Sequence, residues 1–194
     1  MSPGPMSLPR VVAFSASASR PSRTRGLVEA VAADLARARR IDLAVYDLVD
    51  AGAGLVVASR DELPLPARRI VEAIEDADAL IVGTPVYQGS YAGLFKHVFD
   101  FVRPEALLGK PVALTATGGG LRHALVVEHA LRPLFGFFAA HIAPTSVYAG
   151  SAEMEQCRVA DPALAERVRA AAGELAALIE VGRARTGQSS APAA

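Results

Sequence analysis

Residues 80–96, LIVGTPVYQGSYAGLFK, pass from an apolar run through a polar loop into a second apolar pattern. The run at 80–82 contains β-branched residues and predicts a strand buried on both faces. Pro85 has no N–H for a sheet ladder, so we expect the strand to end there. Residues 92–102 favour a helix, and the loop between holds two tyrosines and no charge. A strand, a loop and a helix in this order form half of a βαβ unit.

The same alternation of strand and helix patterns continues along the chain. Apolar runs that predict strands cover residues 11–14, 41–46, 80–82, 112–116 and 142–148. Apolar residues at helical spacing cover residues 22–38, 64–74, 92–102, 121–140 and 161–183. This alternation predicts an α/β fold of three layers, the flavodoxin-like sandwich. Its sheet is expected to have five parallel strands in the order 2-1-3-4-5, with helices on both faces.

Composition limits the classes of protein that the chain can belong to. Of its 194 residues, 52% are hydrophobic and 21% charged, which is typical of a globular protein. A formal net charge of zero argues against a nucleic-acid surface, and no apolar run is long enough to span a bilayer. Cys157 is the only cysteine, and the four histidines lack metal-ligand spacing, so we expect neither a disulfide nor a metal site.

These features together predict a cytoplasmic protein with one folded domain. We expect that domain at residues 10–184, between a flexible lead at 1–9 and a flexible tail at 185–194.

Three loops are expected to meet at one edge of the sheet. They cover residues 15–24, 84–91 and 117–120, each after a predicted strand. The expected order places these three strands side by side, and ligands of such sheets bind outside the carboxyl ends of the strands. Two tyrosines without a charge in the middle loop suit a flat, partly apolar ligand such as a flavin ring. Three consecutive glycines in the last loop allow a ring to approach the backbone closely, although a plain flexible turn is the alternative.

The first loop suits a phosphate group. It precedes a helix N-terminus, where free N–H groups and a partial positive charge favour anions. Ser17, Ser22 and Thr24 add hydroxyl groups, and Arg20 or Arg23 could neutralise the charge. The alternative is that Ser22 is only a helix N-cap and that the arginines are solvated.

Three stretches, SASRPSRT at 17–24, TPVYQGSYAGLFK at 84–96 and ATGG at 116–119, resemble the NAD(P)H-dependent FMN reductase family. The resemblance runs from residue 11 to 148. It is strongest to the reductase components of two-component alkanesulfonate and methanesulfonate monooxygenases. It implies FMN as cofactor, NADH or NADPH as hydride donor, and a partner monooxygenase that receives reduced FMN. The residues that it implies for the FMN phosphate are Ser17, Ser22, Arg23 and Thr24. Those implied for the ring are Pro85, Val86, Tyr87 and Gln88, with Thr117, Gly118 and Gly119 on its other edge.

The same resemblance implies a π-bulge at His129, in a helix at a subunit interface. Pro133 has no N–H, so the carbonyl of His129 loses its usual donor, and such a gap accommodates a bulge. A plain proline kink with a solvent-facing histidine is the alternative. Residues 134–138, LFGFF, are apolar on more than one face of this helix, which favours a homodimer or homotetramer.

The function expected from these observations is NAD(P)H:FMN oxidoreductase activity in sulfonate sulfur assimilation. We expect no indispensable catalytic side chain, because the protein supplies orientation while the flavin supplies the chemistry. Two alternatives remain at this point: an FMN-bound quinone or azo reductase, and a flavodoxin-type electron carrier.

Overall fold

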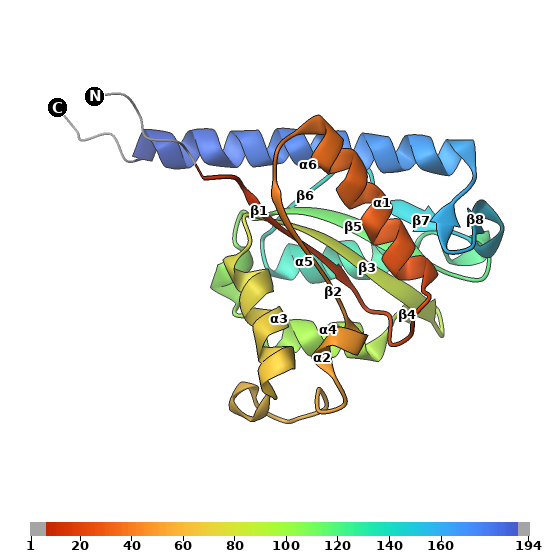
Figure 1. Ribbon diagram of the computed structural model, residues 1–194, viewed down its shortest axis with the longest axis horizontal. Coiled ribbons are helices and arrows are strands. Elements are labelled where there is room, and N and C mark those ends of the chain that lie inside the picture. Colours follow the sequence, from red (N-terminus) through yellow and green to blue (C-terminus); the bar gives the residue numbers. More distant parts are fainter. Residues whose placement is uncertain (1–6, 190–194) are drawn as a thin grey trace.

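The computed structural model describes residues 7–189, which form three layers around a central sheet (Figure 1). In this part of the chain, the main path of the sheet has the order β2-β1-β3-β5-β6, and all neighbours on it are parallel. Its strands are β1 (Arg10–Ser15), β2 (Asp42–Asp47), β3 (Ala79–Tyr87), β5 (Pro111–Thr117) and β6 (His141–Ile142). The predicted α/β class is confirmed, and β1, β3 and β5 lie side by side as expected.

The prediction of a five-stranded parallel sheet in the order 2-1-3-4-5 is nevertheless wrong. Within the described residues this sheet has seven strands, because β4 (Ser90–Tyr91) pairs antiparallel with β3 and β7 (Val147–Ala149) pairs with β5. The predicted strand at 142–148 is divided into β6 and β7. Pro144 between them has no N–H, and the N–H of Thr145 donates to Glu174 at 2.6 Å instead of to a strand.

The expectation that the central strand ends at Pro85 is also wrong, since β3 continues to Tyr87. The carbonyl of Gly83 accepts a bond from the N–H of Ala16, on the side where β1 lies. Backbone direction repeats every two residues, so the nitrogen of Pro85 faces that same side. Pairing between β1 and β3 ends at Ser15 and Gly83, so no neighbouring strand needs a donor from Pro85.

Helices cover both faces of the sheet because alternate strand residues are apolar on both. Val11 and Ala13 belong to the core under α1 (Arg23–Ala38) and α6 (Pro162–Ser189). Val12 and Phe14 belong to the opposite core. The helices on that side are α2 (Leu48–Ala51), α3 (Leu65–Asp76), α4 (Gly93–Asp100) and α5 (Arg132–Phe137). Figure 1 shows α6 and α1 on one side of the sheet and α3 and α4 on the other.

The segment 121–140, expected as one long helix, is divided into three pieces. They are a 3₁₀ turn at Leu121–His123 (η3), a π-helical turn at Val127–Leu131 (η4) and then α5. His129 lies inside the π-helical turn, so the predicted π-bulge is confirmed, and its side chain is exposed. Pro133 follows directly in α5, where its missing N–H removes the usual donor to the carbonyl of His129.

Short elements complete the chain. Three further 3₁₀ turns lie at Arg60–Glu62 (η1), Pro104–Leu107 (η2) and Ser151–Glu153 (η5). A hairpin of β8 (Met154–Glu155) and β9 (Arg158–Val159) precedes α6. That helix reaches Ser189, within the stretch 185–194 predicted as a tail, while residues 1–6 and 190–194 lie outside the described residues. None of the helices in residues 7–189 has the length and apolar character that a bilayer crossing requires.

Candidate functional site

The candidate site lies where β1, β3 and β5 end, and the structure joins the three predicted loops there. The N–H of Ala16, just after β1, donates to the carbonyl of Gly83 in β3 at 2.7 Å. In the neighbouring pair of strands, Pro85 lies opposite Thr117. The hydroxyl of Thr24 lies 2.6 Å from that of Thr117, which connects the first and third loops. The three loops therefore form one continuous edge.

The first loop is ordered by its own serines. The Ser17 hydroxyl donates to the carbonyl of Ser19 at 2.9 Å and lies 3.4 Å from its N–H. Ser22 is the N-cap of α1, and its hydroxyl accepts a bond from the N–H of Arg25 at 3.2 Å. The N-cap role that the sequence left as an alternative is therefore present.

The first turn of α1 offers two backbone donors to a ligand. Within residues 7–189, the N–H groups of Arg23 and Thr24 have no hydrogen-bond partner, and the turn contains no acidic residue. Free N–H groups at the start of a helix, with the helix dipole behind them, attract phosphate. An anion is thus favoured at this end of α1 even though both serine side chains are already bonded.

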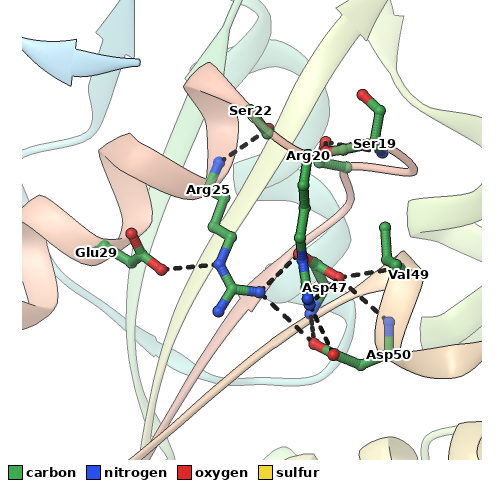
Figure 2. A network of polar contacts seen from close by, with 9 residues as sticks. Ser19, Arg20, Ser22, Arg25, Glu29, Asp47, Val49 and Asp50 are labelled. Atoms are coloured by element: carbon green, nitrogen blue, oxygen red, sulfur yellow. Dashed lines mark hydrogen bonds and ion pairs between the residues drawn. The ribbon is translucent and has the colours of Figure 1, made fainter. Parts of the chain in front are cut away.

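The three arginines near this turn differ in what they contact. Arg20 and Arg25 both point toward Asp47, as Figure 2 shows, at 2.7 Å from Nε of Arg20 and 2.6 Å from a terminal nitrogen of Arg25. The Arg23 guanidinium instead contacts the neutral hydroxyl of Ser151, and no carboxylate of the described chain pairs with it. Arg23 is therefore the arginine whose charge is left for an anionic ligand.

Asp47 remains ionised at the centre of this cluster. Its side chain is fully buried, and burial alone would raise the pKa of the carboxyl. Hydrogen bonds from Arg20 and Arg25 outweigh burial and hold the pKa of Asp47 below its ordinary value. Both guanidinium groups are thereby committed to a carboxylate within the protein.

The hydroxyl of Thr24 faces inward. Thr24 is only 3% exposed and Thr117 only 5%, and their hydroxyls bond to each other. Thr24 can therefore offer its N–H to a ligand while its side chain holds the loops together. Thr117 has the same connecting function on the side of β5.

The middle loop is a tight hairpin, which the sequence analysis did not identify. Gln88 and Gly89 both have positive φ, 49° and 79°, which is typical of the type I′ turns that join antiparallel strands. The Thr84 hydroxyl donates to the carbonyl of Pro85 and accepts from the N–H of Ala92, both at 3.0 Å. Tyr87 is 65% exposed at the end of β3, so the hairpin presents an aromatic ring on a rigid support.

The glycines of the third loop have different functions. A Cβ on Gly118 would lie 2.2 Å from the hydroxyl oxygen of Tyr148, which itself donates to the carbonyl of Gly120 at 2.6 Å. Gly118 is therefore required by packing within the protein. A Cβ on Gly119 would meet nothing within 4 Å, so open space adjoins this residue. The space at the Cβ position is thus open at Gly119 and filled by Tyr148 at Gly118.

Two residues of this edge were missed by the sequence analysis. Tyr148 lies in β7, and Ser151 lies in the turn that follows it. They reach the site only because β7 pairs with the end of β5, and that pairing has no local sequence signal. The residues present fit FMN. Arg23 and the start of α1 suit its phosphate, and Tyr87 and the open side of Gly119 suit its ring.

Comparison with known proteins agrees with this geometry. The family model described as NADPH-dependent FMN reductase matches residues 9–154. An FMN reductase (NADPH) of Pseudomonas aeruginosa is 45% identical over 170 residues, 87% of this chain and 91% of that protein. The NADH-dependent FMN reductase SfnE of Pseudomonas putida is 48% identical over 169 residues, 86% of this chain and 91% of that protein.

Solved structures share the fold. An oxidoreductase of Corynebacterium diphtheriae is 32% identical with a TM-score of 0.77, and the match covers 90% of this chain and 98% of that one. A WrbA-like flavodoxin of Agrobacterium tumefaciens has a TM-score of 0.57 at 18% identity over 92% of this chain and 99% of that one, which confirms the flavodoxin-like fold. With the family model and the two Pseudomonas relatives, these matches confirm the resemblance predicted from the sequence: the chain belongs to the NADPH-dependent FMN reductase family.

Proposed function

We propose that this NAD(P)H:FMN oxidoreductase supplies reduced FMN to a partner monooxygenase that acts on sulfonates as a source of sulfur. The observation that carries the flavin site is the first turn of α1. There, within residues 7–189, the N–H groups of Arg23 and Thr24 have no hydrogen-bond partner and Arg23 pairs with no carboxylate, while the Thr24 hydroxyl bonds to Thr117 of the loop that contains Gly119. Relatives of nearly equal identity are named for NADPH and for NADH, so both nicotinamides are candidate donors.

The residues of the chain hold and orient the reactants. The N–H groups of Arg23 and Thr24 and the Arg23 guanidinium bind the phosphate of FMN. Pro85, Val86, Tyr87 and Gln88 line one edge of its ring, and Thr117 and Gly119 the other. When bound, FMN accepts a hydride from the reduced nicotinamide. No side chain of this edge is required to transfer a proton, so the protein acts by orientation.

The test is nicotinamide oxidation measured with and without added FMN. We expect the rate to rise with free FMN and to saturate, with either NADH or NADPH as donor. Turnover that needs only a quinone or an azo dye, with no dependence on free FMN, would overturn this function. The same assay gives the donor preference from the ratio of kcat/KM values.

Arg23→Gln provides a residue-level test of the phosphate site. Of the three arginines beside this turn, Arg23 alone has no carboxylate partner within residues 7–189, and removing its guanidinium should raise the KM for FMN roughly tenfold. Arg37→Gln is the matched control, because Arg37 is exposed in the last turn of the same helix and pairs with Asp34. We expect its KM for FMN to stay within twofold of wild type; equal effects of both substitutions would contradict the proposed site.

Transfer to a monooxygenase is tested by coupling. Reduced FMN that leaves the protein should support a purified FMN-dependent sulfonate monooxygenase through a dialysis membrane that keeps the two proteins apart. A strict requirement for contact between the proteins would contradict supply by free diffusion.

Since the reduced nicotinamide is a cytoplasmic metabolite, we place the enzyme in the cytoplasm.

We also propose that the chain forms a homodimer or homotetramer through the exposed side of η4 and α5. Leu125 is 64% exposed and Phe137 71% exposed, with His129 exposed between them in the π-helical turn. Leu125 precedes the π-helical turn and Phe137 ends α5, and large exposed apolar side chains at both ends of this segment favour an interface. Light scattering after gel filtration should give a multiple of 20.2 kDa, and Phe137→Glu should reduce that mass. A monomeric wild-type protein would overturn this assembly.

A further inference from the structure

Asp47, at the end of β2, is the most heavily bonded side chain beside the first loop. Its carboxylate is fully buried and receives five hydrogen bonds of 2.6–3.2 Å. Two come from Arg20, one from Arg25, and two from the backbone N–H groups of Val49 and Asp50. Figure 2 shows the two guanidinium groups converging on this carboxylate from the loop and from α1.

The bonds of Asp47 enclose the proposed phosphate-binding turn. Arg20 precedes Ser22, the N-cap of α1, and Arg25 follows the two residues with free N–H groups. Asp47 therefore holds the chain on both sides of those donors. The N–H of Leu48, next to Asp47, adds a bond of 3.1 Å to the carbonyl of Ser17 in the same loop.

The positive charges of this cluster are paired with carboxylates, so none is left to attract a phosphate. Arg20 and Arg25 are balanced by Asp47 and Asp50, and Arg25 also pairs with Glu29 at 2.7 Å. These arginines therefore do not serve as phosphate ligands in this arrangement. What remains for the cluster is position: it fixes where the first turn of α1 lies, and so where its N–H groups point.

We propose that Asp47 is a positioning residue for the FMN phosphate and that it sets the preference of this protein for FMN over riboflavin. It acts through Arg20 and Arg25, and touches neither the flavin nor the nicotinamide. Riboflavin has the same ring without the phosphate, so only FMN depends on the direction of the N–H groups. The inference rests on the proposed function, since it requires the phosphate to bind at the first turn of α1.

The experiment compares Asp47→Asn with a matched variant, Glu75→Gln. Glu75 is also a buried carboxylate, 2% exposed at its side chain, and it too is held by two arginines, Arg60 and Arg103. It lies at the end of α3 and contacts Lys110, which precedes β5, at the opposite edge of the sheet. Both variants should therefore lose the stability that a buried carboxylate provides. Only Asp47→Asn should also weaken binding of the FMN phosphate.

Dissociation constants for FMN and for riboflavin are measured by quenching of flavin fluorescence in the full-length proteins. For Asp47→Asn we expect the constant for FMN to rise roughly tenfold or more, and that for riboflavin to change less than twofold. For Glu75→Gln the ratio of the two constants should equal that of wild type. Asp50→Asn, which removes one partner of Arg20 and leaves Asp47 in place, should give a smaller loss of the same preference.

Three results would decide against the inference. One is an unchanged ratio in folded Asp47→Asn, and another is an equal change of that ratio in Glu75→Gln. If Asp47→Asn does not fold, an unchanged ratio in Asp50→Asn has the same meaning. Failure of the wild-type protein to bind FMN would instead overturn the proposed function, and the two failures are therefore distinguishable.

Discussion

The hydroxyl of Thr24 lies 2.6 Å from the hydroxyl of Thr117, across 93 positions of sequence. Both side chains are buried, one at the start of α1 and the other at the end of β5. The bond joins the loop proposed for the phosphate to the loop proposed for the ring. The relative placement of the two halves of the site therefore depends in part on one pair of hydroxyl groups.

Thr117→Val removes one of these hydroxyls and leaves the other buried without its partner. We expect the free energy of unfolding to fall by about 1–2 kcal/mol, because an unpaired buried polar group loses its hydration. Urea unfolding measures this change. The double variant Thr24→Val with Thr117→Val should lose less than the sum of the two single losses, since both polar groups are then absent.

Thr115→Val is the control for the flavin site. Its hydroxyl is also buried in β5, and it bonds to the carbonyl of Val82 at 3.0 Å and not to a residue of the first loop. The KM for FMN should rise in Thr117→Val and stay near wild type in Thr115→Val. An equal rise in both variants would show that the strand, and not the bond between the loops, is responsible.

Gly118 and Gly119 should respond differently to alanine. Gly118→Ala brings a methyl group against the hydroxyl of Tyr148, and we expect a loss of about 1–3 kcal/mol in unfolding free energy. Adding Tyr148→Phe should recover part of that loss. Gly119→Ala meets open space, so stability should hold while the dissociation constant for FMN rises. Unchanged FMN binding in Gly119→Ala would move the ring away from this residue.

Glu75 predicts a specific loss of stability in acid. Burial alone would raise its pKa, but hydrogen bonds from Arg60 and Arg103 lower it from 4.5 to about 2. The carboxyl takes up its proton at a higher pH in the unfolded protein than in the folded protein. The contribution of Glu75 to stability is therefore complete above about pH 4.5 and is lost as the pH falls toward 2. Glu75→Gln should cost about 2–4 kcal/mol at pH 7 and flatten the pH dependence of unfolding in that window. A parallel pH dependence in both proteins would contradict the assignment.

The buried ammonium of Lys110 leads us to expect a second rise of stability with pH, in the alkaline range. Its ammonium donates to the carbonyls of Ile74 and Glu75 at 2.9 and 2.7 Å, at the end of α3. Burial lowers its pKa from 10.5 to about 8, so the folded protein releases this proton first. The contribution of Lys110 to stability therefore rises between about pH 8 and 10.5. In Lys110→Met, chemical unfolding over this range should show no such rise in the free energy of unfolding. A rise equal to that of wild type would contradict the lowered pKa of Lys110.

The sequence predicted those parts of the fold that depend on local patterns. Apolar periodicity located β1, β2, β5 and the long α6, because burial of one face dictates that spacing. Pro133 located the π-helical turn through a missing donor, together with the family resemblance. The sequence does not predict the hairpin of β3 and β4, because Pro85 indicates a strand end. In the structure the Pro85 nitrogen faces a position where β1 has already ended.

The arrangement of the site depended on partners that no local pattern shows. Ser17, Ser22 and Thr24, which the resemblance implies for the phosphate, have hydroxyls that are bonded within the protein. Nothing in the spacing of the arginines distinguishes Arg23 from Arg20 and Arg25. Their difference arises because β2 places Asp47 beside two of them and β7 leads to Ser151 beside the third. The flavin contacts that the resemblance implies stay predictions.

The hairpin that continues β3 past the end of β1 has a consequence for the energetics of flavin exchange. A projecting pair of strands, closed by a two-residue turn and anchored by Thr84, loses its conformational freedom when the chain folds. Binding of a flavin then costs little conformational entropy, because little backbone remains to be ordered. Dissociation of the flavin restores equally little backbone freedom. Arrival and departure can both be rapid under these conditions, which suits a protein whose product must be handed on before oxygen consumes it.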